Sequence, residues 1–241
     1  MAGGPAASFS HYLPCSALPP RKSQADCPDE DPRIPNFDKD FVIPVVHSSD
    51  QLWAIDKPYD LRIDGDFSNS VEKFVMRRNA PMDKFRLVNQ LDFATSGLMM
   101  IAMNKPADRE ASKLFAERKT TKHYLAVGVG HDERDIGEIV EVNRSIRPKE
   151  NDFRMELVPE GEDSVEICKG RHHKAGAVCR TLVMPVLKTR LDEKYGGGEC
   201  TVYLMRPISG RRHQLRLHLV SLGHPILGDA TYGSRTVKGS F

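Results

Sequence analysis

The 241-residue chain lacks the features that mark membrane-spanning, secreted and zinc-binding proteins. Its five cysteines are odd in number and form no Cys-x-x-Cys pair, which argues against a disulfide framework and a structural zinc site. No window approaches the roughly 18 uncharged apolar residues of a membrane span. The first charged side chain is Arg21, so the basic start of a secretory signal peptide is missing. We therefore expect an intracellular protein with reduced thiols, and the cytosol, the nucleus and the mitochondrion all stay open.

Charge of one sign is also scarce overall, but it is unevenly distributed. The formal net charge is only +2, with 39% hydrophobic and 28% charged residues, which is typical of a soluble globular chain with a core. Residues 206–241, however, contain six Lys or Arg and one carboxylate, Asp229, so this stretch alone carries +5. A local excess of this kind favours an anionic partner, although a solvated basic face is the ordinary interpretation.

The chain divides into a short extension and one folded region. Eight of its 16 prolines fall in the first 44 residues, so we expect residues 1–40 to form a flexible, proline-rich N-terminal extension. The folded domain is expected over residues 41–241. Within it, residues 131–175 are polar and irregular, and the whole segment 131–200 resembles a variable insert.

Apolar periodicity and capping residues predict a mixture of strands and helices. The predicted elements are strands at 51–57, 98–103, 122–129, 177–187 and 200–206, and helices after Ser70, after Asn104 and over 211–222, the last capped by Ser209. Strands and helices do not alternate regularly, which argues against a doubly wound parallel sheet. The pattern predicts an α+β fold with a mostly antiparallel, curved sheet and flanking helices.

The predicted last helix begins with an unusual group of cations. Arg211, Arg212 and His213 would occupy its first turn, where the helix dipole favours anions instead. One explanation is a phosphate or carboxylate site, and the other is that all three side chains point into solvent. Arg216 lies one turn further on, beside the predicted buried stripe, and an arginine there needs a carboxylate partner.

Two further residues stand out because of their surroundings. Asp92 lies in a polar turn that leads through Gly97 into a buried strand, where it could cap the turn or serve as an active-site carboxylate. Tyr124 shares one face of its strand with Ala126 and Gly128, which leaves room beside its ring. No metal site is expected, because the histidines in the C-terminal part lack ligand spacing.

Four sequence blocks together resemble the RluA-type family of RNA pseudouridine synthases. They are Asp56-Lys-Pro58, Leu91-Asp-Phe-Ala-Thr-Ser-Gly-Leu98, Thr121-Lys-His-Tyr-Leu-Ala126, and Gly210-Arg-Arg-His-Gln-Leu-Arg-Leu-His218 continuing to Gly233. The resemblance spans about residues 50–233, and residues 89–93 look most like a eukaryotic branch of the family. It implies an α+β catalytic domain around a mixed, largely antiparallel sheet, with RNA bound across it.

The resemblance also implies roles for individual residues. Asp92 matches the catalytic aspartate, Tyr124 the active-site tyrosine, and Arg216 the arginine that pairs with the aspartate. The basic groups expected to bind RNA phosphates are Lys122, Arg211, Arg212 and His213. Isomerisation of uridine to pseudouridine gains and loses no atom, so no cofactor is expected. The expected partner is ribosomal, transfer or messenger RNA, and a monomer is the simplest assembly.

The chain departs from the family pattern next to the aspartate. Most relatives have His-Arg where this chain has Asn89-Gln90, so Gln90 takes the place of an arginine that helps to hold the flipped-out RNA site. This loss keeps open a second hypothesis, an RNA-binding protein that retains the fold with weak or no catalysis. A small-molecule hydrolase that uses Asp92 and His213 would explain neither the basic C-terminal stretch nor Tyr124.

Overall fold

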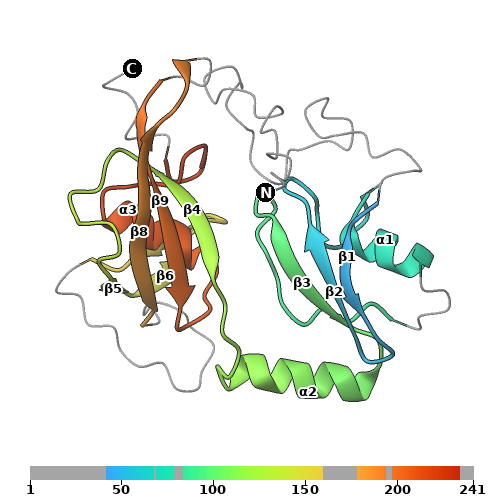
Figure 1. Cartoon of the computed structure of the whole chain (residues 1–241). Coiled ribbons are helices and arrows are strands. Elements are labelled where there is room, and N and C mark those ends of the chain that lie inside the picture. Colours follow the sequence, from blue (N-terminus) through green and yellow to red (C-terminus); the bar gives the residue numbers. More distant parts are fainter. Residues whose placement is uncertain (1–41, 68, 79–83, 160–177, 194–196, 234–241) are drawn as a thin grey trace, which may run out of the picture. The chain divides into compact units, whose positions relative to one another are not determined.

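The computed structural model describes residues 42–67, 69–78, 84–159, 178–193 and 197–233. The helices and strands labelled in Figure 1 are β1 (Val45–Ser48), β2 (Leu52–Lys57), α1 (Val71–Arg78), β3 (Gly97–Ala102), α2 (Lys105–Ala116), β4 (Tyr124–Val129), β5 (Val140–Asn143), β6 (Ile146–Pro148), β7 (Met155–Leu157), β8 (Arg180–Arg190), β9 (Glu199–Pro207) and α3 (Gln214–Ser221). The expected extension over residues 1–40 and part of the insert-like segment lie outside the described residues.

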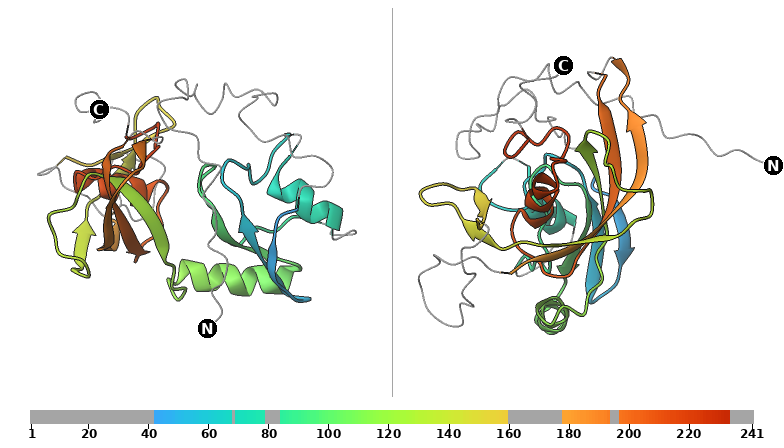
Figure 2. Two further views of the ribbon diagram at one scale, coloured as in Figure 1. Left: turned by 45° about the horizontal axis from the view of Figure 1, so that its top comes forward. Right: turned by 90° about the vertical axis from the view of Figure 1, so that its left-hand side faces the viewer.

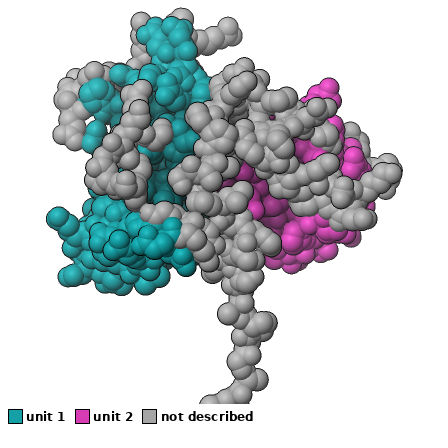
Figure 3. Space-filling view, turned by 90° about the horizontal axis from the view of Figure 1, so that it is seen from above, with its two compact units in different colours: residues 1–21, 122–241 teal, residues 22–121 magenta. Residues whose placement is uncertain are grey.

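The described residues form two compact units, which divide between Thr121 and Lys122 and are coloured separately in Figure 3. We call them the N-terminal unit and the C-terminal unit. The N-terminal unit contains an antiparallel sheet of order β1-β2-β3. Residues next to Leu87 run along the far side of β3 through a bridge to Ile101, and both β2 and β3 place apolar side chains in the core.

The helices of the N-terminal unit begin where their capping residues predict. The Asn104 Oδ1 atom accepts a hydrogen bond from the Ala107 amide at 3.0 Å and caps α2. The Ser70 Oγ atom accepts one from the Lys73 amide at 3.2 Å and caps α1 in the same way. Both predicted helix starts are therefore confirmed.

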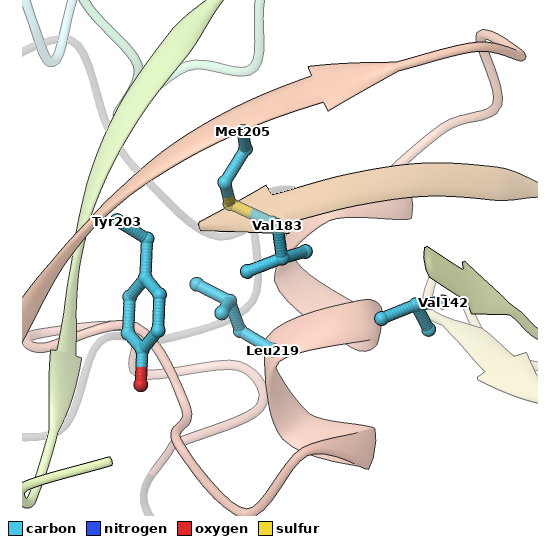
Figure 4. Close-up of a cluster of buried hydrophobic side chains, with 5 residues drawn as sticks. All are labelled: Val142, Val183, Tyr203, Met205 and Leu219. Atoms are coloured by element: carbon cyan, nitrogen blue, oxygen red, sulfur yellow. The ribbon is translucent and has the colours of Figure 1, made fainter. Parts of the chain in front are cut away.

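The C-terminal unit is built on a four-stranded antiparallel sheet of order β4-β9-β8-β5. Helix α3 lies against one face of this sheet, as the views in Figures 1 and 2 show. The core between them contains five buried side chains, drawn in Figure 4: Val142, Val183, Tyr203, Met205 and Leu219. Tyr124 and Ala126 pack against this cluster, whereas Leu125 is 73% exposed, so the predicted alternation along β4 is confirmed.

Two predictions about the C-terminal unit were wrong in detail. Residues 131–175 are not simply irregular, because they contain β5 and the two-stranded β6-β7 sheet. The last helix begins at Gln214 rather than at residue 211, and Ser209 does not cap it directly. Instead, the Gln214 Oε1 atom accepts hydrogen bonds from the Ser209 hydroxyl at 2.9 Å and from the Arg211 amide at 3.1 Å.

The predicted α+β class is confirmed. Every strand pairing within the described ranges is antiparallel, and the strands form three separate sheets, where one curved sheet had been expected. Three helices accompany the sheets in the part of the chain that the structure describes. Among the residues that the structure describes, none of the helices has the length and apolar character needed to cross a bilayer.

Candidate active site

Asp92 begins a tight turn that leads into β3. The Thr95 amide donates to the Asp92 carbonyl oxygen at 3.0 Å, which closes the turn. Gly97 ends it with a φ of +123°, a backbone conformation that side-chain-bearing residues rarely adopt. The predicted turn is therefore confirmed, and it places a half-buried Asp92 just before the start of β3.

A buried lysine is hydrogen-bonded to the backbone of this turn. Lys57, the last residue of β2, has no exposed surface, and its Nζ atom donates to three carbonyl oxygens. The acceptors are Pro58 at 2.8 Å, Phe93 at 3.0 Å and Thr95 at 2.8 Å. Burial lowers the pKa of Lys57 to about 8, against the opposing effect of the negative charges on Asp60 and Asp92.

The residues just before Asp92 have distinct surroundings. The Asn89 Oδ1 atom accepts a hydrogen bond from the Met100 amide at 2.7 Å, so Asn89 fastens this segment to β3. Gln90 is exposed. A different cation lies near the turn, because the guanidinium carbon of Arg62 is 3.9 Å from the ring centroid of Phe67 and 5.5 Å from that of Phe93.

In the C-terminal unit, Tyr124 is the first residue of β4 and lies opposite Met205 of β9. Its half-buried ring packs on the side of the sheet that α3 covers. Lys122 precedes it and is also half-buried, and burial lowers the pKa of its amine. The Lys122 Nζ atom lies 3.4 Å from the point where a Cβ atom on Gly210 would stand, so this amine adjoins the turn before α3.

The first three cations of the last block, Arg211, Arg212 and His213, lie on that turn rather than on the helix. Arg211 and Arg212 are exposed, and His213 adopts a left-handed conformation with a φ of +57°. A 2.7 Å hydrogen bond joins the His213 Nδ1 atom to the Tyr232 hydroxyl. The same hydroxyl accepts a hydrogen bond from the Met155 amide at 2.9 Å, so the turn is tied to two other segments of the unit.

Arg216 is held in place by a carboxylate of its own unit. Its Nε and Nη2 atoms donate to the two carboxylate oxygens of Asp229, each at 2.7 Å. The Asp229 side chain is only 6% exposed. Burial alone would raise the pKa of Asp229, but hydrogen bonds and the charge of Arg216 hold it below its ordinary value. The Arg216 guanidinium also lies over the Tyr232 ring, 4.8 Å from its centroid.

The structure therefore adds Asp229 to the expected surroundings of Arg216. Asp92 belongs to the N-terminal unit and Arg216 to the C-terminal unit, so the pairing of these two residues stays a prediction. The pattern contained a signal for the observed partner, because Asp229 is the single carboxylate among residues 206–241. Lys57 and Tyr232 lie in the matched blocks, but the sequence pattern predicted no role for either residue.

A second buried carboxylate lies after the end of β4, away from Tyr124 at its beginning. Asp132 is 3% exposed and accepts a hydrogen bond from the Tyr203 hydroxyl at 2.9 Å and another from the Arg134 Nε atom at 2.8 Å. Burial raises the pKa of Asp132, but these hydrogen bonds outweigh it and lower the value to about 2. The His224 Nε2 atom lies 3.8 Å from the same carboxylate.

The histidines of the C-terminal part have separate partners. His213 bonds to Tyr232, His218 to the Arg144 carbonyl at 3.3 Å, and His224 to the Val129 carbonyl at 3.0 Å. Among the described residues, no group of three or more His, Cys, Asp or Glu side chains is arranged to bind a metal ion.

Comparisons with known proteins show the family of the chain. The family model described as RNA pseudouridylate synthase matches residues 51–221. The mouse RNA pseudouridylate synthase domain-containing protein 1 is 33% identical over 199 residues, which are 78% of this chain and 60% of the mouse protein. The dual-specificity RNA pseudouridine synthase RluA of Pasteurella multocida is 32% identical over 201 residues, covering 83% of this chain and 81% of the bacterial protein.

A solved structure gives the same relationship. The human RNA pseudouridylate synthase domain containing 1 matches with a TM-score of 0.64 and 32% identity, over 80% of this chain and 70% of the human one. The chain thus spans about three fifths of the length of the mouse relative and most of the bacterial one. The family match contains the Asp92 turn, Tyr124 and Arg216. The chain belongs to the RNA pseudouridylate synthase family.

Proposed function

We propose that this protein is an active RNA pseudouridine synthase that converts uridine to pseudouridine in structured RNA, with Asp92 as its catalytic residue. The observation that carries the proposal is the construction of the Asp92 turn. This turn is fixed by the buried ammonium of Lys57, by the hydrogen bond from the Thr95 amide to the Asp92 carbonyl, and by the positive φ of Gly97. It lies within the family match. Such a rigid support is what a reacting carboxylate requires.

The reaction makes a specific demand on that carboxylate. Pseudouridine forms when the N1–C1′ glycosidic bond of uridine breaks, the uracil turns, and its C5 atom bonds to C1′. The C5 atom then loses its proton and N1 takes up a proton, so the product is an isomer of uridine. An ionised carboxylate can attack C1′ as a nucleophile or accept a proton from the sugar as a base, and we assign this role to Asp92. The base returns to the same sugar, so the step needs no redox partner or energy source.

We assign Tyr124 to contact with the uracil and Arg216 to pairing with the charge of the Asp92 carboxylate. The ring of Tyr124 can stack on the uracil, and its hydroxyl can assist removal of the C5 proton. Arg216 supplies a cation for the Asp92 carboxylate. The bidentate contact with Asp229 and the Tyr232 ring fix the direction of this guanidinium, and support for the assignment comes from the family match, which contains Arg216.

The RNA must release the target base before reaction, at a cost of a few kcal/mol. We assign the grip on flanking phosphates to Lys122, Arg211, Arg212 and His213, with the exposed Gln90 contacting the RNA beside Asp92. Support comes from their placement, because Lys122 adjoins the turn that carries the other three cations.

A second candidate function is RNA binding with weak or no catalysis. The pair Asn89-Gln90 favours it, because Asn89 is committed to β3 and Gln90 carries no charge. The two functions differ in what the protein does to RNA. A transcriptome-wide map of pseudouridine with and without the protein should lose specific sites when the protein is absent. An unchanged map, together with RNA bound in cells, would support the second function.

A further inference from the structure

The buried ammonium of Lys57 donates three hydrogen bonds to backbone carbonyl oxygens. An ammonium group has three N–H bonds, and in Lys57 they match three carbonyl oxygens at 2.8–3.0 Å. One acceptor, Pro58, belongs to the residue that follows the lysine. The other two, Phe93 and Thr95, lie 36 and 38 residues away, on the turn that Asp92 begins.

Both of these acceptors follow Asp92 within three residues. Phe93 follows Asp92 directly, and Thr95 donates its amide to the Asp92 carbonyl at 3.0 Å. The ammonium therefore fixes the backbone of the turn after Asp92 from inside the N-terminal unit. An apolar side chain of the same length could fill the space but could not bond to the carbonyls.

Core filling alone does not account for a lysine at this place. Burying an ammonium is costly, and the cost is visible as a pKa lowered to about 8 by burial. The carboxylates whose charges oppose this effect are Asp60, in the turn after β2, and Asp92 itself. A costly charge beside the reacting carboxylate is typical of a functional site.

We propose that Lys57 is a positioning residue for pseudouridine formation, and that its three hydrogen bonds hold the Asp92 carboxylate in its reactive orientation. Lys57 acts through the turn and does not touch the RNA. The proposal rests on the proposed function, because it requires Asp92 to be the group that reacts.

The geometry predicts an alkaline limit to turnover. A neutral amine keeps only two N–H bonds, so deprotonation leaves one of the three carbonyls without its donor. The free energy of unfolding changes in the opposite direction. The pKa of Lys57 is about 8 in the folded state and 10.5 ordinarily, so the unfolded chain binds more protons between these values and this lysine makes the fold more stable as the pH rises. A loss of turnover in this range therefore cannot come from unfolding through Lys57.

The decisive variant is Asp60→Asn, which removes a negative charge that helps to keep Lys57 protonated. Asp60 has a φ of +55°, a conformation that asparagine tolerates well. The wild-type kcat should fall as the pH rises through about 8, and the fall in Asp60→Asn should occur about 0.5–1 pH unit lower. The matched control is Asp64→Asn, which changes an exposed carboxylate of the same loop and should keep the wild-type profile. Coinciding profiles of Asp60→Asn and the wild type would overturn the proposal, because ionisation of the uracil itself is the same in both.

A second variant tests the positioning role directly. Lys57→Met keeps an unbranched side chain that is one atom shorter and removes all three side-chain donors. Its kcat should fall about 100-fold, the scale of a misplaced reacting group, while the Kd for RNA stays within a factor of about three. Equal losses of RNA affinity and kcat would contradict a role confined to the turn. If Lys57→Met does not fold, the profiles of the Asp60 and Asp64 variants decide.

Failure of this proposal and failure of the proposed function have different signatures. If Asp92→Asn retains full turnover, the proposed function fails whatever Lys57 does. If Asp92→Asn is inactive and the Asp60 profile does not move, the role of Lys57 alone fails. Amide hydrogen exchange at Thr95, corrected for intrinsic rates, measures how stably the same turn is closed and does not depend on enzyme activity. Its protection should drop above pH 8 in the wild type and at lower pH in Asp60→Asn, and constant protection would overturn the positioning role.

Discussion

The Arg216–Asp229 pair gives a quantitative test of how the C-terminal unit holds its arginine. Asp229→Ala removes two charge-assisted hydrogen bonds of 2.7 Å and leaves a guanidinium that is only 20% exposed. It also removes the acceptor of the Thr231 and Tyr232 amides. Removing one partner of a buried pair costs about 3–5 kcal/mol, and the partial exposure of Arg216 places the expected loss near the lower end, at about 3 kcal/mol.

This loss should lower the Tm by about 6–12 °C, given about 2–4 °C per kcal/mol for a chain of this size. Thermal unfolding followed by circular dichroism measures it. The matched control is Glu141→Gln, which breaks the pair of Glu141 with Arg180 at the surface of the same unit, where the side chains are 39% and 50% exposed. The Tm of that control should not change measurably. Equal Tm values for Asp229→Ala and Glu141→Gln would refute the view that burial makes the first pair important.

The contribution of the Arg216–Asp229 pair to the free energy of unfolding should fall as the pH is lowered. The pKa of Asp229 is lower in the folded state than its ordinary value, so its contribution to stability is present above pH 4 and is lost as the pH falls through the folded-state value. The gap in unfolding free energy between the wild type and Asp229→Ala should therefore narrow on acidification. A gap that widened would contradict the assignment.

Two further predictions concern the other end of β4. Tyr203→Phe removes the 2.9 Å hydrogen bond to Asp132 and should cost about 1–2 kcal/mol at pH 7, as urea unfolding would show. Because the pKa of Asp132 is about 2 only with its partners in place, this difference should shrink between pH 4 and 2, and a constant difference would argue against the bond. Gly128→Ala would place a Cβ atom 2.7 Å from the Tyr203 ring and 2.9 Å from the His224 carbonyl, so it should lower the free energy of unfolding by about 1–3 kcal/mol. The matched control is Gly210→Ala, whose nearest contact is 3.4 Å and whose urea midpoint should be nearly unchanged. Equal midpoints for the two glycine variants would show that the backbone yields at residue 128.

The sequence predicted the elements that carry strong local signals. The strand 98–103 is a continuous apolar run after a glycine, and the helix after Asn104 begins with a cap and a proline, so β3 and α2 were found close to their observed ends. Strands β5, β6 and β7 were missed because they have three or four residues each, too few for a period to show. Strand β5 is stabilised by pairing with the distant β8, whereas β6 and β7 pair with each other across a short loop.

The candidate site was predictable as a set of residues and less so as a set of contacts. Asp92, Tyr124 and Arg216 came from motifs whose residue types suit the chemistry. The start of α3 was misplaced because the side chain of Gln214, a residue inside the helix, satisfies the turn before it. Lys57 was missed as a support because a lysine after an apolar strand is ordinarily exposed, and only its long-range acceptors show that it is buried.

The substitution Asp92→Asn tests whether Asp92 is the carboxylate that reacts with the sugar. Asp92→Asn preserves the size of the side chain and one acceptor oxygen but removes the charge that must attack or deprotonate the sugar. Purified wild-type and variant protein would be compared on the same RNA, with pseudouridine counted by mass spectrometry of the digested RNA and with binding measured separately. We expect no detectable pseudouridine from Asp92→Asn and an RNA affinity within a few-fold of wild type. Pseudouridine formation by the variant at the wild-type rate would contradict it.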